Sequence, residues 1–396
     1  MQYSSAALTV FERRISAGLA RLASAGLTRR CPAITQRDGV RYRVDGRSVI
    51  GLCSNDYLGL ADEIRSPPAA AGSGGSRLIC GDLAGHRDVE QMLAEQIGSE
   101  DAVLFPSGYQ LNLGVLPAAI TREDLVCSDA LNHASLIDGL RLARAELRIL
   151  PHLAAPDAVA LPEGDAALWW VTESTFSMDG DIVDIDALRR HLDRGGVAYV
   201  DEAHALGLYR GGRGLLGERG VVPSILVGTL GKSFGVAGAF VAASAQACAW
   251  IRSRARSFVF STGPSPTLVA AIATAIERVR SADGDRRRER LWSAVAHLAA
   301  RLGVEHAPSP IFPIVIGDNE TTLAIAAALL ERGWHVQPIR PPTIPAGTAR
   351  LRITVSAEHD SSMIDAFVDD LQTLLHDARV PLVVARGLGD PGAIAP

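Results

Sequence analysis

Between about residues 87 and 245 the chain alternates short apolar runs with amphipathic segments of helical length. The runs expected to form strands are 102–105, 125–127, 147–150, 168–171, 197–200, 225–228 and 238–242, and helices are expected at 87–98, 109–120, 134–144 and 184–193. This alternation predicts an α/β fold in which helices cover both faces of a mostly parallel, doubly wound sheet. Ligands of such sheets bind at the carboxyl ends of the strands.

The flanking segments suggest further divisions. Residues 1–45 are expected to form an N-terminal arm, whose helical repeat over 5–25 aligns Leu8, Phe11, Ile15, Leu19 and Leu22 on one face. The large domain is expected over 46–275. A smaller C-terminal α+β domain follows over 276–379, with strands near 311–316, 334–339 and 350–355 and helices near 321–332 and 361–376. Residues 380–396, rich in Gly, Pro and Ala, are expected to be a loose tail.

Bulk composition excludes several classes of partner. The 396 residues carry a formal net charge of −5, which provides no electrostatic basis for binding nucleic acid or an anionic membrane. Five dispersed cysteines without a Cys-x-x-Cys pair predict free thiols in a reducing compartment and no metal site. The start of the chain lacks an apolar signal core, and no run approaches the roughly 20 apolar residues that span a bilayer. We therefore expect a cytoplasmic protein.

One lysine, Lys232, lies among the glycine and hydroxyl residues of 228–235, directly after an apolar run at 224–227. A lysine at the end of a buried strand is costly unless it is neutral or bonded. A Schiff base with pyridoxal phosphate removes that cost, because the imine replaces the ammonium. Thr229 offers a hydroxyl to a phosphate. By itself the stretch is equally consistent with a surface lysine in a glycine-rich turn.

Two further strand ends carry groups suited to the same cofactor. Ser107, Gly108 and Tyr109 open a helix whose free N–H groups suit an anion, although ordinary capping has the same pattern. Asp201 follows the strand at 197–200, and a carboxylate there can keep a pyridine nitrogen protonated. His204 is then close enough to bond the phenolic oxygen of the ring. The alternative is a capping Asp beside a core His.

Histidine and hydroxyl groups complete the pattern. His133 stands at a loop-to-helix junction, where an imidazole can stack on a flat ring and exchange protons, although most single histidines are structural. Residues 173–180 follow another strand and offer hydroxyls, or form a simple polar turn. Because five strand-end loops carry such groups in one α/β chain, together they favour a pyridoxal phosphate site over coincidence.

The whole set resembles the pyridoxal-phosphate-dependent α-oxoamine synthases, of the aspartate-aminotransferase-like fold type I. The resemblance covers nearly the whole chain, and its motifs lie at 54–60, 72–77, 107–109, 132–136, 176–181, 201–204, 229–232 and 339–352. It is strongest for the branch that makes 8-amino-7-oxononanoate, because of the Arg-Pro-Pro-Thr and Gly-Thr-Ala-Arg-Leu-Arg sequences in the last motif. That branch joins L-alanine to a pimeloyl thioester of coenzyme A or acyl carrier protein, with loss of CO2, in biotin biosynthesis.

The resemblance implies roles for individual residues. Lys232 would hold the cofactor and remove the Cα proton of alanine, Asp201 would keep the ring protonated, and His133 would stack on it and contact the substrate. The implied cofactor contacts are Gly108, Tyr109, Ser177, Asp201, His204, Thr229 and Lys232. The implied substrate contacts are His133, Asn55, Thr348 and Arg352, with Arg352 and Asn55 on the amino-acid carboxylate.

The family is a homodimer with shared sites, which implies that Ser261 and Thr262 serve the partner's phosphate. Three features depart from its pattern: the short 61–72 segment, Thr28 where some relatives place an arginine that Arg29 could replace, and Glu202 after Asp201. Two alternatives stay open. One is a sister synthase using another amino acid or acyl thioester, such as a glycine C-acyltransferase, and the other is a non-catalytic pyridoxal phosphate-binding protein.

Overall fold

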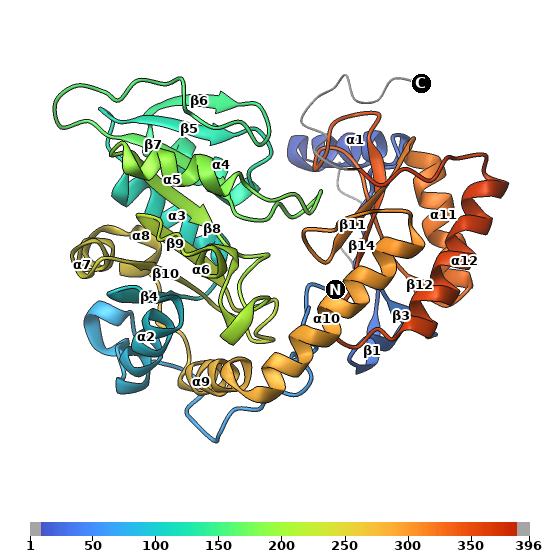
Figure 1. The fold of residues 1–396 in the computed structure, drawn as a ribbon, viewed down its shortest axis with the longest axis horizontal. Coiled ribbons are helices and arrows are strands. Elements are labelled where there is room, and N and C mark those ends of the chain that lie inside the picture. Colours follow the sequence, from blue (N-terminus) through green and yellow to red (C-terminus); the bar gives the residue numbers. More distant parts are fainter. Residues whose placement is uncertain (1–8, 386–396) are drawn as a thin grey trace.

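A seven-stranded sheet forms the centre of the larger lobe in this computed structural model, which describes residues 9–385 (Figure 1). The sheet has the order β4-β10-β9-β8-β7-β5-β6. Its strands are β4 (Asp101–Phe105), β5 (Leu125–Asp129), β6 (Glu146–Leu150), β7 (Leu168–Glu173), β8 (Val197–Asp201), β9 (Ile225–Thr229) and β10 (Ala239–Ala243). Strands β5 to β9 are mutually parallel, and β10 runs antiparallel to both neighbours. The predicted mostly parallel α/β sheet is confirmed.

The antiparallel strand has a simple cause. Only the segment 230–238, which contains Lys232, separates β9 from β10. A parallel return needs a crossover of a dozen or more residues, so a link this short makes an antiparallel pair. The lysine therefore sits in a tight connection at the carboxyl end of β9.

Helices cover both faces of this sheet. On one face α3, α4, α7 and α8 pack side chains such as Leu111, Leu136, Ile251 and Phe258 onto the strands. On the other face lie α2, α5, α6 and α9. These helices are α2 (Ala84–Ile97), α3 (Gly108–Ala119), α4 (Ala134–Ala143), α5 (Ile185–Asp193), α6 (Leu215–Arg219), α7 (Ala245–Arg254), α8 (Arg256–Val259) and α9 (Pro266–Arg280). This double cover accounts for the near-continuous apolar runs of the central strands.

The smaller lobe is built on two further sheets, β11-β14-β13 and β1-β2-β3-β12. Its elements are β1 (Ile34–Asp38), β2 (Arg41–Val44), β3 (Arg47–Gly51), α10 (Ala282–Arg301), β11 (Ile311–Gly317), α11 (Asn319–Glu331), β12 (Trp334–His335), β13 (Gln337–Ile339), β14 (Ala349–Thr354) and α12 (Ser361–Asp377). Figure 1 shows α10 running from the larger lobe to the smaller one. One apolar cluster includes buried side chains of both lobes, so their cores are continuous.

Two expectations about the smaller lobe differ from the structure. Strand β3 was expected in the large domain, but it pairs with β12 and lies with the C-terminal lobe. The single strand expected over 334–339 is two, because the chain passes between sheets and β13 pairs with β14 instead. Both differences come from long-range strand pairing, which local patterns do not reveal.

The start of the expected loose tail is ordered. Val384 bridges to Ile314, the amide of Ala385 donates to the Pro313 carbonyl at 2.9 Å, and Ala385 is buried. The free edge of β11 offers unpaired backbone groups, and this segment satisfies them. Residues 386–396 of the tail lie outside the described residues.

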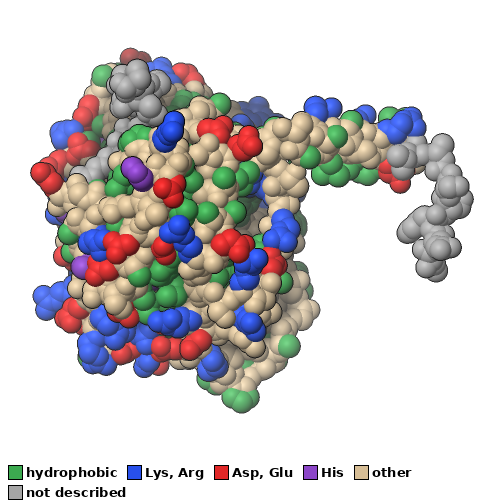
Figure 2. Space-filling view, turned by 90° about the vertical axis from the view of Figure 1, so that its right-hand side faces the viewer, with side chains coloured by type: hydrophobic (Ala, Val, Ile, Leu, Met, Phe, Trp, Pro, Cys, Tyr) green, Lys and Arg blue, Asp and Glu red, His purple; other side chains and the backbone are tan. Residues whose placement is uncertain are grey.

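The N-terminal helix α1 (Val10–Ser24) begins after a Thr9 cap that accepts from the Glu12 amide at 3.2 Å. None of its residues is buried, and Figure 2 shows the helix projecting from the body with hydrophobic side chains along one side. Leu8, also assigned to that face, lies outside the described residues. Within residues 9–385, every helix is too short or too polar to cross a bilayer.

Candidate active site

A cavity of about 360 Å³ lies where β7, β8 and β9 end and α3 and α4 begin. Most of the residues predicted for the site share its wall. These residues are Asn55, Gly108, Tyr109, His133, Asp201, His204, Thr229 and Lys232. The carboxyl edge of the large sheet thus brings together groups from Gly108 to Lys232, 124 residues apart, as the strand-end pattern predicted, and Asn55 joins them from the smaller lobe.

Lys232 shares this cavity with two acids, Asp201 and Glu173. Loss of water around its amine lowers the pKa of Lys232 from 10.5 to about 8, although the charges of Asp201 and Glu173 oppose the shift. A lysine with this pKa is partly neutral near pH 7, so its amine can act as a nucleophile or a base.

Asp201 ends β8 and is almost fully buried. Its Oδ1 accepts from the Ala203 amide at 2.9 Å, and its Oδ2 accepts from the Asn112 side-chain nitrogen at 3.2 Å. Both partners donate hydrogen bonds, so each carboxylate oxygen has a donor that fixes its position.

Burial disfavours the charged form of both histidines. Desolvation lowers the pKa of His133 against the opposing charge of Asp201, and its Nδ1 lies 2.8 Å from Ser135 Oγ. Desolvation also lowers the pKa of His204 well below 6.5, and its Nδ1 lies 2.7 Å from the Tyr57 hydroxyl. Neutral imidazoles here offer one donor and one acceptor nitrogen each.

Glu173 is a wall residue that the sequence reasoning did not single out. It ends β7 and is the register partner of Asp201 on β8, so two acids lie side by side. Desolvation, reinforced by the charge of Asp201, raises the pKa of Glu173 to about 8. Its Oε1 accepts from the His133 amide at 2.7 Å. An acid within two residues of the end of each of two predicted strands, 168–171 and 197–200, was the available signal.

Arg352 reaches the cavity edge from β14 of the smaller lobe. Its Nη1 donates to Asn55 Oδ1 at 3.1 Å, its Nε donates to the Ser177 carbonyl at 2.5 Å, and its buried Nη2 has no partner within residues 9–385. A guanidinium edge with spare donors suits a carboxylate.

Besides Arg352, two other predicted residues are not in the cavity wall. The Ser177 carbonyl accepts a hydrogen bond from Arg352, and Ser177 is not among the residues that line the cavity. Thr348 donates its hydroxyl to the Pro345 carbonyl at 2.8 Å within the turn before β14. Their assignment to the cofactor and the substrate stays a prediction.

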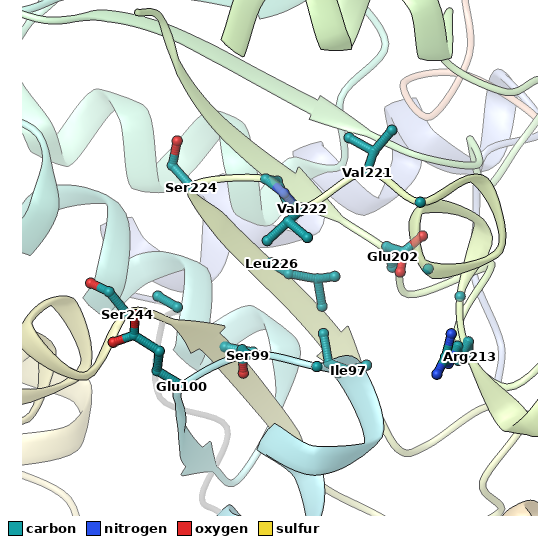
Figure 3. A pocket seen from close by; sticks show the side chains of 17 residues that line it. Ile97, Ser99, Glu100, Glu202, Arg213, Val221, Val222, Ser224, Leu226 and Ser244 are labelled. Atoms are coloured by element: carbon teal, nitrogen blue, oxygen red, sulfur yellow. The ribbon is translucent and has the colours of Figure 1, made fainter. Parts of the chain in front are cut away.

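A larger cavity of about 670 Å³ lies elsewhere (Figure 3). It is bounded by the end of α2, by α6 and by the start of β9, and apolar side chains such as Val221 and Leu226 line it. Glu202 also lines it, and its Oε1 accepts from the Leu216 amide at 2.8 Å. Glu202 therefore supports α6 rather than the cavity that holds Lys232.

The cavity residues fit pyridoxal 5′-phosphate. The buried hydroxyl of Thr229 has no partner among the described residues, which suits a phosphate oxygen. A Cβ on Gly108 would lie 2.8 Å from Thr229 Cγ2, so only glycine leaves this corner open. The fold and the site together define a pyridoxal-phosphate-dependent enzyme of the aspartate-aminotransferase type.

Comparison with known proteins agrees with this class and narrows it to one family of enzymes. The family model for aminotransferase class I and II matches residues 47–371. The 8-amino-7-oxononanoate synthase of Anaeromyxobacter dehalogenans (strain 2CP-C) is 45% identical over 91% of this chain and 95% of its own length. That of Herminiimonas arsenicoxydans is 41% identical over 89% and 97%. The chain belongs to the 8-amino-7-oxononanoate synthase family of pyridoxal-phosphate-dependent acyltransferases.

Solved structures place it in the same fold. A serine palmitoyltransferase from S. paucimobilis with bound PLP–myriocin superposes with a TM-score of 0.84 at 27% identity, covering 94% of this chain and all of the other. An 8-amino-7-oxononanoate synthase from Francisella tularensis gives 0.69 at 22% identity, covering 84% and 99%, a level that supports the fold alone.

Proposed function

We propose that this protein condenses L-alanine with a pimeloyl thioester to give 8-amino-7-oxononanoate, CO2 and free thiol, in the biotin pathway of the cytoplasm. The proposal is supported by relatives of that name at 40–45% identity over about nine-tenths of the chain. The observation that carries the chemistry is Lys232, whose pKa is lowered to about 8 in a cavity that it shares with Asp201.

Bound pyridoxal phosphate would supply an aldehyde for an amine and a ring that stabilises negative charge at the neighbouring carbon. Lys232 would hold it and then accept the Cα proton of alanine at Nζ. Asp201 would keep the proton on the ring nitrogen, and His133 would cover the ring. Asn55 and Arg352 would hold the alanine carboxylate.

The bond changes balance once one proton is taken up from solvent, because one proton leaves Cα while the thiolate and the product Cα each receive one. A carbon–carbon bond forms between alanine Cα and the thioester carbonyl carbon, and the thiolate leaves with a proton as free thiol. The alanine carboxylate then departs as CO2, and one proton returns to Cα. With its pKa near 8, Lys232 can both accept and return a proton at neutral pH.

A homodimer with shared sites is the second part of the proposal. It is supported by the exposed apolar side chains of α1 and by exposed Ile79 and Phe260. Thr262, two residues after Phe260, bridges to Ser76, three residues before Ile79, and with Ser261 it would serve the partner's phosphate. Light scattering tests the dimer, and a monomer that is fully active would contradict it.

Growth rescue of a biotin-requiring strain that lacks this step tests the reaction. The wild-type gene should restore growth without biotin, and Lys232→Ala should not.

A sister synthase is the second candidate, because a serine palmitoyltransferase matches the fold with a TM-score of 0.84. Failure of rescue, together with faster turnover of glycine or serine than of alanine, would favour it. Indifference of the bound cofactor's absorbance to every amino acid would favour a non-catalytic role.

A further inference from the structure

Asn112 is a buried wall residue without an assigned role. It lies on α3, one turn beyond Gly108, and only 1% of its surface is exposed. A buried amide must satisfy its donors and its acceptor internally. Its bonds join the two sides of the cavity.

The amide nitrogen of Asn112 donates to Asp201 Oδ2 at 3.2 Å and to Ser135 Oγ at 2.9 Å. Its Oδ1 accepts from the Tyr199 hydroxyl at 2.6 Å. Rotating the amide by half a turn would place its oxygen against the Asp201 carboxylate, which is repulsive. The neighbouring groups therefore determine the orientation of the amide.

This orientation sets the direction of the next hydrogen bond. Ser135 Oγ accepts from Asn112, so its single proton is free for His133 Nδ1 at 2.8 Å. The Ser135 amide also points to Nδ1, at 3.3 Å. With two donors directed at Nδ1, the proton of the neutral ring must sit on Nε2.

We propose that Asn112 is a positioning residue that anchors the Asp201 carboxylate and, through Ser135, holds His133 as the Nε2–H tautomer. The pyridoxal phosphate site thereby receives a carboxylate for the ring nitrogen and a defined donor on the imidazole. This inference rests on the cofactor site and not on the identity of the acyl thioester. It therefore stands or fails separately from the proposed reaction.

The first test uses the wild-type protein without cofactor. Nitrogen-15 spectra of histidine-labelled protein distinguish a protonated from an unprotonated ring nitrogen, and His133→Gln identifies the signals. We expect His133 to show an unprotonated Nδ1 and a protonated Nε2 near pH 7. A proton on Nδ1 would overturn the proposal, whether or not any variant of Asn112 folds.

The second test compares cofactor affinity among variants, measured by titration with pyridoxal phosphate. Asn112→Asp places a second acid against Asp201 and should weaken binding about 10- to 100-fold at pH 8, because a hydrogen bond to a charged group is lost. Acidification should restore part of the affinity, since a protonated Asp at position 112 is again a donor. Asn112→Leu should show no such recovery.

Two matched variants separate the effect of Asn112 on Asp201 from its effect on His133. Ser135→Ala should change the His133 spectrum while leaving cofactor affinity within about threefold, because the bond from Asn112 to Asp201 remains. Asn132→Asp alters a buried asparagine that donates to Ser128 Oγ and to the Val171 carbonyl, and it should not acquire the pH-dependent affinity. A folded Asn112→Asp protein with wild-type affinity and pH profile would refute the role.

Discussion

Raising the pH above 9 should remove a buried charge that ties the site's loops together. His152 follows β6, and only 1% of its side chain is exposed. Its Nδ1 lies 2.9 Å from Asp129 Oδ1, and its Nε2 lies 3.4 Å from Asp181 Oδ2. Asp181 lies four residues after Ser177, and the Ser177 carbonyl accepts a hydrogen bond from Arg352. The charged imidazole thus connects the end of β5 to the loop whose Ser177 carbonyl holds Arg352.

The magnitude follows from the pKa. Desolvation alone would lower the pKa of His152, but the hydrogen bonds and charges of Asp129 and Asp181 outweigh it and raise the pKa from 6.5 to about 9. At 1.36 kcal/mol per pKa unit, this difference corresponds to about 3 kcal/mol of stability. Because the folded pKa is the higher one, this stability is fully present below pH 6.5 and is lost as the pH rises through 9.

The assay measures the free energy of unfolding of wild type and of His152→Gln in urea between pH 6 and pH 10. The difference between the two proteins removes the contribution of the titrating groups that they share. The free-energy advantage of wild type should shrink by about 3 kcal/mol over this range. Nuclear magnetic resonance should find the His152 ring titrating near pH 9. A constant difference between the two proteins, or a ring that titrates at or below pH 6.5, would refute the reasoning.

Three substitutions test the rest of the site. Lys232→Ala should abolish turnover while the protein still binds cofactor, and residual turnover near the wild-type rate would disprove its role as the base. Gly108→Ala places a methyl group 2.8 Å from Thr229 Cγ2, so titration should show cofactor affinity reduced about 10-fold. Unchanged affinity would mean that Thr229 moves aside and that the glycine is not required. Arg350→Met leaves the buried carboxylate of Asp179 unpaired and should cost about 3–5 kcal/mol in thermal unfolding. Adding Asp179→Asn should recover part of that loss, and no recovery would argue against the ion pair as the cause.

Much of the site could be predicted because its groups follow strands. Lys232 after β9, Asp201 at the end of β8 and His133 after β5 each follow an apolar run that is visible in the sequence. Parallel strands bring their carboxyl ends to one edge, so local patterns were enough to place these three together. The resemblance to known synthases added Arg352 and Asn55, which no local pattern connects.

Other features depended on packing between distant segments. Glu173 lies beside Asp201 because β7 and β8 pair in that register, and Asn112 reaches Ser135 because α3 packs against α4. The ordered Val384 likewise depends on the free edge of β11.

The sequence by itself therefore determined the fold class, the cofactor and the residues at the strand ends, since these follow from hydrophobic periodicity and from side chains next to it. Only the tertiary structure decided which neutral groups orient those residues, and how Arg352 of the smaller lobe meets Asn55. A hydrogen bond depends on tenths of an ångström and on the angle between packed elements, and neither quantity is encoded in the spacing of residues along the chain.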